Sequence, residues 1–330
     1  MRPAMFRWNT DDWFRIFVEG KDAKRFLHGM LTNDIRALGD SAGLVAAMVS
    51  AQGKTLALMH VYQLHSEKFL LVTHAITGES LLDYLKRHVI LEDVTINKVP
   101  EHWVQLGVYG NAAKFLLKEI APAKPDKIVQ RGSQDKPFLV MVTEEWGPGH
   151  FWIMGDFETV NTAFLNQVGS STMQSREISQ QEAESHRIAS GTPYYGIEIN
   201  EDRLPLEVGL EHIVSFNKGC YVGQEVLNRL HSKDLLSRTL IGMQFSTPDT
   251  MGTFVGSLLS HESRNQAGVI CSYSLSNDFG PIGLAYVHRS VSHIGSVFKF
   301  QPIGYDEPVY SMMLPLPFRS TADMEFSDRS

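Results

Sequence analysis

Stretches of alternating apolar and polar residues give way to stretches with helical spacing along the first part of the chain. Apolar side chains in WFRIFVEG (13–20) fall on one face, which predicts a strand. Over residues 23–38 they are three or four apart, which predicts a helix with Asp22 as its N-cap. Alternating stretches on both sides of AQGK (51–54) then predict a meander of strands.

Helix boundaries are marked more clearly in the middle of the chain. Asp156 is expected to begin a helix over residues 157–168. Ser179 and Glu182 have the spacing of a capping box, and the helix that they open is expected to end at Gly191. Strands and helices therefore continue to alternate through this region.

Short strands separated by glycine, serine and proline at the end of the chain predict a small β-barrel. The fold class is therefore α+β, and a chain of 330 residues is expected to form more than one domain. We expect an N-terminal α/β module at 1–100, a second at 101–235, a barrel at 236–318 and a flexible tail at 319–330. The two α/β modules are expected to be interleaved in sequence.

Composition limits the classes of function. Hydrophobic residues make up 43% and charged residues 20%, and no stretch approaches the roughly 18 to 20 apolar residues of a membrane span. Acidic residues near the start stand where a secretory signal needs an apolar run, so we expect a cytoplasmic protein, or a mitochondrial-matrix one in a eukaryote. The net charge of -7 argues against broad nucleic-acid binding.

Cys220 and Cys271 are the two cysteines of the chain. Two thiols are too few for a disulfide framework, and without a CxxC pair or a nearby His/Cys cluster they cannot complete a zinc or iron-sulfur site alone. We therefore expect no metal site built by this chain itself, and any cluster would have to be shared with a partner.

Cys220 lies in NKGCYVGQEVLNR (217–229), between a stretch that predicts a strand, HIVSF (212–216), and one that predicts a helix. A helix N-terminus and the positive charge of Lys218 both favour the thiolate, which is the reactive form. The alternative is a small, half-buried packing residue, which is the usual state of a free cysteine. No Cys-His-Asp triad can be recognised from spacing alone.

The octapeptide KGCYVGQE (218–225) resembles the K-G-C-Y-x-G-Q-E signature of the YgfZ/IBA57 group of folate-binding proteins. These are relatives of the glycine-cleavage T-protein that assist iron-sulfur cluster assembly. DAKRFLHGMLTNDI (22–35), RIASGTPYYGIEI (187–199) and GPIGLAYVHR (280–289) are similar to other segments of the superfamily, so the resemblance covers nearly the whole chain. It implies a T-protein-like ring of three modules, with the two α/β modules around a central folate pocket and a C-terminal β-barrel.

The resemblance also implies roles for individual residues. Glu207 matches the superfamily glutamate that holds the pterin ring, and adjacent pterin N–H groups suit one carboxylate. The alternative for Glu207 is a solvated loop acid. Cys220 and Lys218 are the candidates for the reactive centre. Further candidates for binding tetrahydrofolate, which could instead be polar surface residues, are Arg187, Gln224, Glu225 and Arg229.

The turn between two early strands departs from the T-protein pattern. The family reads G-G-I-x-D-D there, with an aspartate central to aminomethyl transfer, whereas this chain reads QGKTLA (52–57). Leu56 and Ala57 cannot exchange a proton or hold a folate nitrogen by charge, so glycine cleavage is not expected. The Q-G-K form is similar to the YgfZ/IBA57 branch.

The leading hypothesis is a tetrahydrofolate-dependent accessory protein in the assembly or repair of iron-sulfur clusters, with Cys220 as the acting thiol. Its expected partners are folate and iron-sulfur assembly or client proteins. The alternatives are a folate-dependent one-carbon transferase with altered chemistry and a non-catalytic interaction scaffold. The sequence leaves open whether the protein turns over a substrate.

Overall fold

The computed structural model describes residues 4–110, 112–122, 127–143, 150–171 and 174–318, so the predicted flexible tail at 319–330 lies outside the described residues. The chain divides into two compact units, each assembled from separate segments. The first unit comprises Met1–Ile178, Asn200–Pro205 and Leu210–Asn228, and the second comprises Ser179–Ile199, Leu206–Gly209 and Arg229–Ser330.

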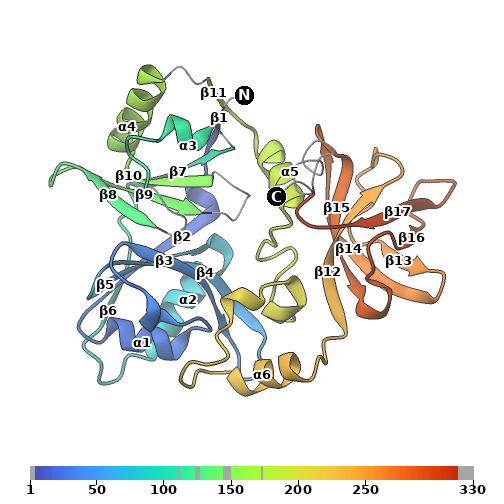
Figure 1. Cartoon of the computed structure of the whole chain (residues 1–330), viewed down its shortest axis with the longest axis horizontal. Helices are drawn as coiled ribbons and strands as arrows, with labels where there is room; N and C mark the ends of the chain where they lie inside the picture. The colour runs from blue at the N-terminus through green and yellow to red at the C-terminus, as the bar shows by residue number, and fades with distance from the viewer. Residues whose placement is uncertain (1–3, 111, 123–126, 144–149, 172–173, 319–330) are drawn as a thin grey trace, which may run out of the picture. The chain divides into compact units, whose positions relative to one another are not determined.

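One sheet of the first unit has five antiparallel strands in the order β3-β4-β5-β2-β6 (Figure 1). The predicted meander is confirmed, because β3, β4 and β5 are both consecutive and neighbouring. Two helices bury apolar side chains against this sheet. The elements are β2 (Trp13–Glu19), α1 (Ala23–Met30), β3 (Ala42–Val49), β4 (Thr55–His65), β5 (Lys68–His74), α2 (Ala75–Arg87) and β6 (Thr95–Lys98).

The helix predicted over 23–38 is shorter than expected. α1 ends at Met30, and a single 3-10 turn, η2 (Ile35–Ala37), follows. Asp22 makes no side-chain capping hydrogen bond, since its Oδ2 accepts from the backbone N–H of Asp93 at 3.0 Å. The predicted side-chain cap is therefore wrong, and the carboxylate ties two loops together instead.

The other sheet of the first unit has six strands in the order β11-β1-β7-β10-β9-β8. Its N-terminal strand thus pairs with strands that begin after residue 100. Helix α4 begins as predicted, because the Asp156 side chain accepts from the N–H groups of Glu158 and Thr159. The elements are β1 (Ala4–Trp8), β7 (Trp103–Tyr109), α3 (Ala113–Leu116), β8 (Ile128–Gly132), β9 (Pro137–Thr143), β10 (His150–Asp156), α4 (Phe157–Ser170) and β11 (Ser175–Glu177).

Aromatic side chains pack between the two sheets of the first unit. Trp13 on β2 stacks on His74 with ring centroids 4.6 Å apart and contacts Trp152 on β10 at 4.7 Å. His60 on β4 meets the same Trp152 ring edge-on, also at 4.7 Å. Buried apolar residues of both sheets belong to this cluster. The two sheets therefore form one packed body.

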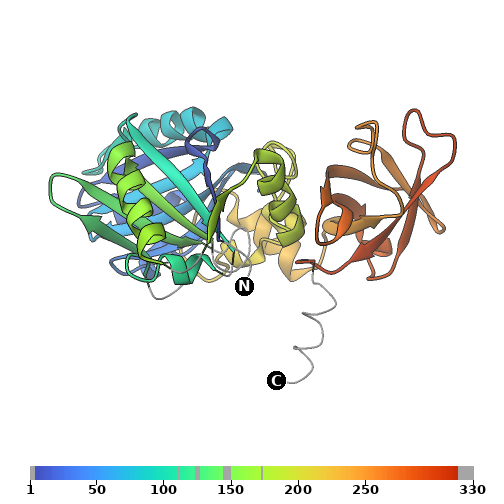
Figure 2. The same cartoon turned by 90° about the horizontal axis from the view of Figure 1, so that it is seen from above.

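The second unit contains a closed six-stranded barrel (Figure 2), which confirms the predicted C-terminal barrel. Helix α5 (Gln180–Ser190) packs against the barrel strand β14. Ser179 accepts from the N–H of Glu182 at the start of α5, and Gly191 ends it with a φ of 74°, so both predicted boundaries are confirmed. The barrel strands in spatial order are β12 (Arg238–Phe245), β15 (Gly280–His288), β14 (Arg264–Ser276), β13 (Leu258–His261), β16 (Val297–Phe300) and β17 (Val309–Leu314).

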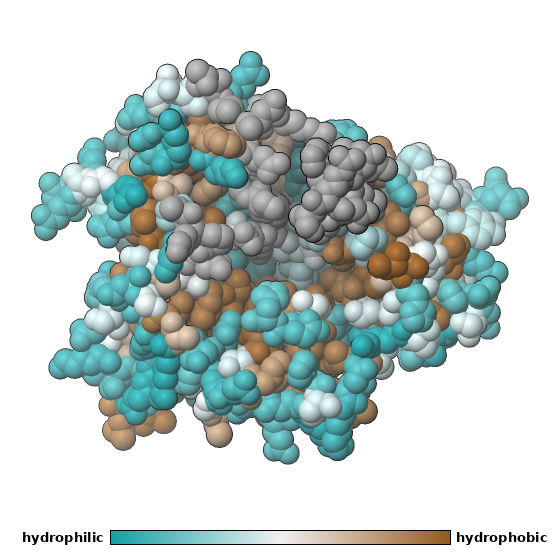
Figure 3. All heavy atoms as spheres, viewed as in Figure 1, coloured by the Kyte–Doolittle hydropathy of each residue, from teal (hydrophilic) through white to brown (hydrophobic). Residues whose placement is uncertain are grey.

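Hydrophilic residues cover much of the face drawn in Figure 3, with apolar residues between them. Within the ranges that the structure describes, no helix combines the length and the apolar character needed to cross a membrane.

Candidate functional site

Cys220 lies in a loop of residues 217–223, which we call the Cys220 loop. The strand predicted at 212–216 is wrong, because a 3-10 turn, η4 (Glu211–Ile213), and bends occupy this region. Helix α6 (Gln224–Ser232) begins only after the loop, so Cys220 precedes the helix and does not lie directly at the helix N-terminus that the sequence predicted. The thiol is exposed. Exposure contradicts the alternative of a half-buried packing cysteine.

Lys218 fixes one end of the Cys220 loop to the end of α1. Its ammonium donates to the carbonyl oxygens of His28 at 2.5 Å, Asn33 at 2.9 Å and Leu31. The last carbonyls of a helix lack partners within the helix, and a cation is favourable there. Since an ammonium has three N–H donors, these carbonyls use all of them. Lys218 is therefore an anchor of the loop, and its effect on the thiolate stays a prediction.

The environment of the loop shifts two titrating side chains. Burial lowers the pKa of Lys218 to about 8, with Asp34 opposing this shift and Arg36 adding to it. The ammonium is still the main form at pH 7. Burial raises the pKa of Tyr221 to about 12, and its buried hydroxyl has no hydrogen-bond partner within the described ranges. The Tyr221 ring lies 4.8 Å from the Lys218 Nζ, so the loop also packs on itself.

Gly223 fixes the other end of the Cys220 loop against the β3–β4 turn. It has a φ of 81°, and a Cβ atom added to it would lie only 2.4 Å from the carbonyl oxygen of Ser50. Such close approach of two backbones requires glycine. Gln224 closes the loop, since its Nε2 donates to the carbonyl oxygen of Lys218 at 3.2 Å. The exposed thiol is thus carried by a segment held at both ends.

Glu207 lies in a 3-10 turn of the second unit, η3 (Pro205–Val208), and is only 7% exposed. The alternative of a solvated loop acid is therefore wrong. A carboxylate is costly to bury unless hydrogen-bond donors or cations meet it. The role of Glu207 in holding a pterin stays a prediction.

Arg187 is a structural residue of the second unit. It is fully buried on α5, with Nη1 3.0 Å from Oε2 of Glu198 and Nε donating to Oε2 of Glu184 at 2.8 Å. Burial alone would lower the pKa of Arg187, but the hydrogen bonds and charges of both glutamates raise it above its ordinary value. The expectation that Arg187 attracts a folate tail or lies on the surface is therefore wrong, because its side chain is fully buried.

The remaining predicted site residues lie on α6. Gln224 is half-buried and braces the Cys220 loop, whereas Glu225 and Arg229 are exposed. Exposure is compatible with either a ligand contact or a solvated charge. Their roles in folate binding stay predictions.

The structure adds a histidine that sequence reasoning missed. His28 on α1 is 6% exposed, and its Nδ1 lies 3.3 Å from Oδ1 of Asp34. A Cβ atom built on Gly219 would lie 3.9 Å from the His28 Nε2. His28 and Asp34 both belong to the resembling segment 22–35, but nothing in that segment indicates that it meets the Cys220 loop.

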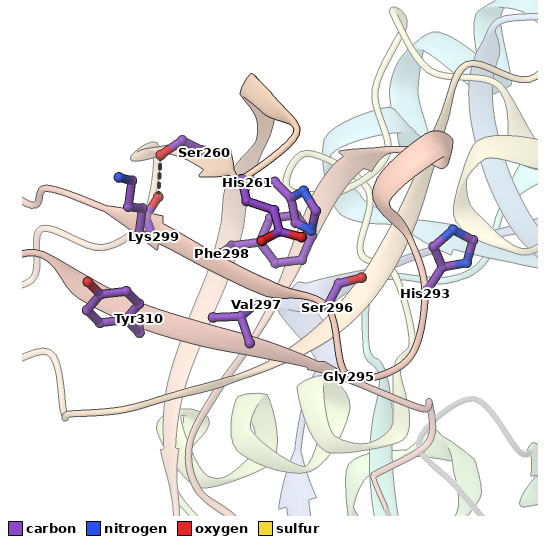
Figure 4. Close-up of a pocket in the computed structure, with 10 residues that line it drawn as sticks. Ser260, His261, His293, Gly295, Ser296, Val297, Phe298, Lys299 and Tyr310 are labelled. Atoms are coloured by element: carbon purple, nitrogen blue, oxygen red, sulfur yellow. Dashed lines mark hydrogen bonds between the residues drawn. The ribbon is translucent and has the colours of Figure 1, made fainter.

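A groove of about 690 Å³ lies on the barrel (Figure 4). Strands β13 and β16 line it, and the Ser260 hydroxyl donates to the carbonyl oxygen of Lys299 across it. None of the site residues predicted from the sequence lines this groove. Its lining residues are Ser260, His261, Glu262, His293, Gly295, Ser296, Val297, Phe298, Lys299 and Tyr310.

In the part of the chain that the structure describes, no three or more His, Cys, Asp or Glu side chains are grouped so that they could hold a metal ion. Cys271, the second thiol, is half-buried on β14. Of the two thiols, Cys220 is therefore the exposed one.

Residues 8–132 match the family model of the GCVT N-terminal domain. Aminomethyltransferase of Chloroherpeton thalassium is 26% identical over 305 residues, which cover 90% of this chain and 83% of that protein. The tRNA-modifying protein YgfZ of Shigella sonnei is 26% identical over 235 residues, which cover 70% of this chain and 69% of that protein.

The crystal structure of glycine cleavage system aminomethyltransferase T from Bartonella henselae superposes with a TM-score of 0.84 at 19% identity. The match covers 96% of this chain and 86% of that one, which confirms the expected fold. The domain match and the relatives show that this chain is similar to proteins of the glycine-cleavage T-protein superfamily, and the structural match shows that it shares their fold.

Proposed function

We propose that this chain is a tetrahydrofolate-binding protein of the YgfZ/IBA57 group that acts through Cys220 in the assembly or repair of iron-sulfur clusters. The observation that carries this proposal is the exposed thiol on a loop held at both ends by Lys218 and Gly223. The KGCYVGQE resemblance and the relatives named YgfZ support the choice of group within the superfamily. Iron-sulfur assembly or client proteins, in the cytoplasm or the mitochondrial matrix, would be the partners.

A fixed loop suits a reactive thiol for an energetic reason. Ordering the backbone of one residue costs about 1–2 kcal/mol. The contacts of Lys218 and Gly223 offset this cost for the Cys220 loop when the protein folds. The exposed sulfur is then available to a partner without further ordering of the loop. A scaffold protein needs no such arrangement around a single thiol.

Glu207 would hold the pterin ring of tetrahydrofolate. Its buried carboxylate can accept two adjacent N–H groups, and hydrogen bonds to a charged acceptor are the stronger kind. Tetrahydrofolate, when bound, supplies a carrier for one-carbon units. The protein contributes the buried acceptor that orients the ring.

Calorimetric titration with tetrahydrofolate tests the folate part of the proposal. Glu207→Gln should weaken binding by roughly 1.5–3 kcal/mol, or about ten- to more than a hundredfold, because the charged acceptor is lost. The matched control is Glu211→Gln, a neighbouring exposed acid, which should bind like the unaltered protein. Equal affinity of all three proteins would reject Glu207 as the pterin anchor.

A folate-dependent one-carbon transferase is the second candidate, since several relatives are named aminomethyltransferase. Leu56 and Ala57 on β4 count against the glycine-cleavage form of that chemistry, because neither side chain can carry a proton or a charge. Product formed from a folate one-carbon donor would favour the transferase. Folate binding without turnover would favour the accessory protein.

A further inference from the structure

The outer face of the barrel carries an apolar strip on strands β16 and β17. Val297 is paired with Met312 across these strands, and in the next row on the same face Lys299 is paired with Tyr310 (Figure 4). We call these four residues the barrel strip. Its apolar members Val297, Tyr310 and Met312 are 51%, 49% and 39% exposed. Neighbouring apolar side chains that stay in contact with water mark interaction surfaces.

Two further apolar side chains extend the barrel strip at opposite ends. Leu258 on β13 and Ile294 before β16 are 68% and 70% exposed. Leu258 lies two residues before Ser260, which is paired with Lys299 in an antiparallel register, so Leu258 lies beyond the Lys299 row. Ile294 precedes Val297 in the chain and lies beyond the other row. The exposed apolar surface therefore continues past both rows.

Charges of opposite sign lie toward the two ends of the barrel strip. Lys299 is exposed in the row that Ser260 joins. Glu262 is also exposed, lines the same groove as Val297 and Lys299, and follows Ser260 by two residues, which places it at the Val297 row in the antiparallel register. Two residues of a strand span about 6.6 Å. One row thus carries a cation, and the other row is flanked by an acid.

We propose that a second copy of this chain covers the barrel strip, about a twofold axis that runs across the strands between the two rows. Such an axis exchanges the rows, so Lys299 of each copy meets Glu262 of the other. It also brings Tyr310 of each copy against Met312 of the other, and a thioether beside an aromatic ring is a favourable contact. A twofold interface requires a patch that is complementary to itself. Opposite charges at opposite ends of an apolar strip meet this requirement.

The same charges disfavour other occupants of the barrel strip. An anionic lipid surface is attracted by clusters of cations, whereas the strip has a single lysine and Glu262 beside it. An acidic partner protein would meet Lys299 but would be repelled by Glu262, because like charges held close together are unfavourable. A second copy pairs both groups.

Sedimentation equilibrium of the full-length protein over a range of concentrations tests the proposal. The strip has few residues compared with the roughly 20–30 on each side of a stable interface, so we expect a reversible dimer with a Kd of about 10–100 µM. Lys299→Glu and Glu262→Lys should each raise this Kd by at least about fivefold, because the axis repeats each repulsion twice. The double variant, Lys299→Glu with Glu262→Lys, should return the Kd to within about twofold of the original, since both pairs are restored with reversed sign.

Two more variants complete the experiment. Lys86→Glu reverses an exposed lysine on α2 and should leave the Kd unchanged. Tyr310→Thr keeps a residue that suits a strand, and it should raise the Kd by at least about tenfold because the aromatic contact is lost. Circular dichroism shows whether each variant is folded, and Tyr310→Thr decides if a charge reversal is not.

A protein that stays monomeric up to about 0.5 mM would overturn the proposal, because dimers of this size dissociate below that concentration. A dimer that is unaffected by the single charge reversals, or one that the double variant fails to restore, would place the contact on another surface and would also overturn it. The proposal rests on neither Cys220 nor folate, so its failure leaves the proposed function untouched.

Discussion

Replacing Gly223 by alanine perturbs the point where the Cys220 loop meets the β3–β4 turn. The new Cβ atom would lie 2.4 Å from the Ser50 carbonyl oxygen, 2.9 Å from Cγ2 of Val49 and 3.3 Å from the Cα of Gly53. Two of these neighbours are backbone atoms, which cannot rotate away as a flexible side chain can. The loop or the turn must therefore shift.

The cost has two parts that can be separated. A φ of 81° is unfavourable for alanine by about 1–2 kcal/mol. Forcing an extra carbon into a packed contact adds about 1–3 kcal/mol. Gly209 is the matched control, because it has a φ of 74° and nothing within 4 Å of an added Cβ atom. Gly209→Ala should therefore show only the first part.

Urea unfolding of the full chain, followed by far-ultraviolet circular dichroism, measures both variants. We expect Gly223→Ala to lose about 2–5 kcal/mol of unfolding free energy and Gly209→Ala about 1–2 kcal/mol. Equal losses in the two variants would refute the close contact between the Cys220 loop and the turn. Alkylation of Cys220 should also change in Gly223→Ala only, because only there does the loop move.

Two other predictions concern Lys218 and the early turn. Because burial lowers the pKa of Lys218 to about 8, whereas a lysine in the unfolded chain titrates near 10.4, the unfolded state binds more protons between these values. The unfolding free energy of the unaltered protein should then rise relative to that of Lys218→Met from about pH 8 to about pH 10. Urea titrations of both proteins at each pH measure this difference in unfolding free energy. A difference that stays flat or falls would contradict the lowered pKa of Lys218. Because Leu56 and Ala57 carry no acid, no methylenetetrahydrofolate should form from an aminomethyl-lipoyl donor protein, and its detection by a coupled assay would overturn this expectation.

Features that depend on residues close together in the sequence could be predicted. The boundaries of α5 follow from Ser179, which meets an N–H three residues later, and from Gly191, which adopts a positive φ. The barrel was also predictable, because alternation and turn residues recur at short intervals along its strands. In contrast, Asp22 had the right residue type for a cap, but a distant backbone N–H competes for its carboxylate.

Contacts between distant segments could not be predicted in the same way. Lys218 is 190 residues from His28, and neither segment alone indicates that the ammonium meets the end of α1. The same contact brings the buried His28 close to Gly219 of the loop, which spacing along the sequence could not show. Arg187 was misjudged because its partner Glu198 is buried with it, and a charged pair of this kind cannot be told from two surface residues by sequence pattern.

The most direct measurement of the central claim is rescue of iron-sulfur enzyme activity in cells that lack the native protein. Cys220→Ser removes the thiol at an exposed position and should leave the protein folded and expressed but unable to rescue. Cys271→Ser is the matched control, and it should restore activity like the unaltered chain. Full rescue by Cys220→Ser at a normal expression level would contradict the proposal that this protein acts through Cys220.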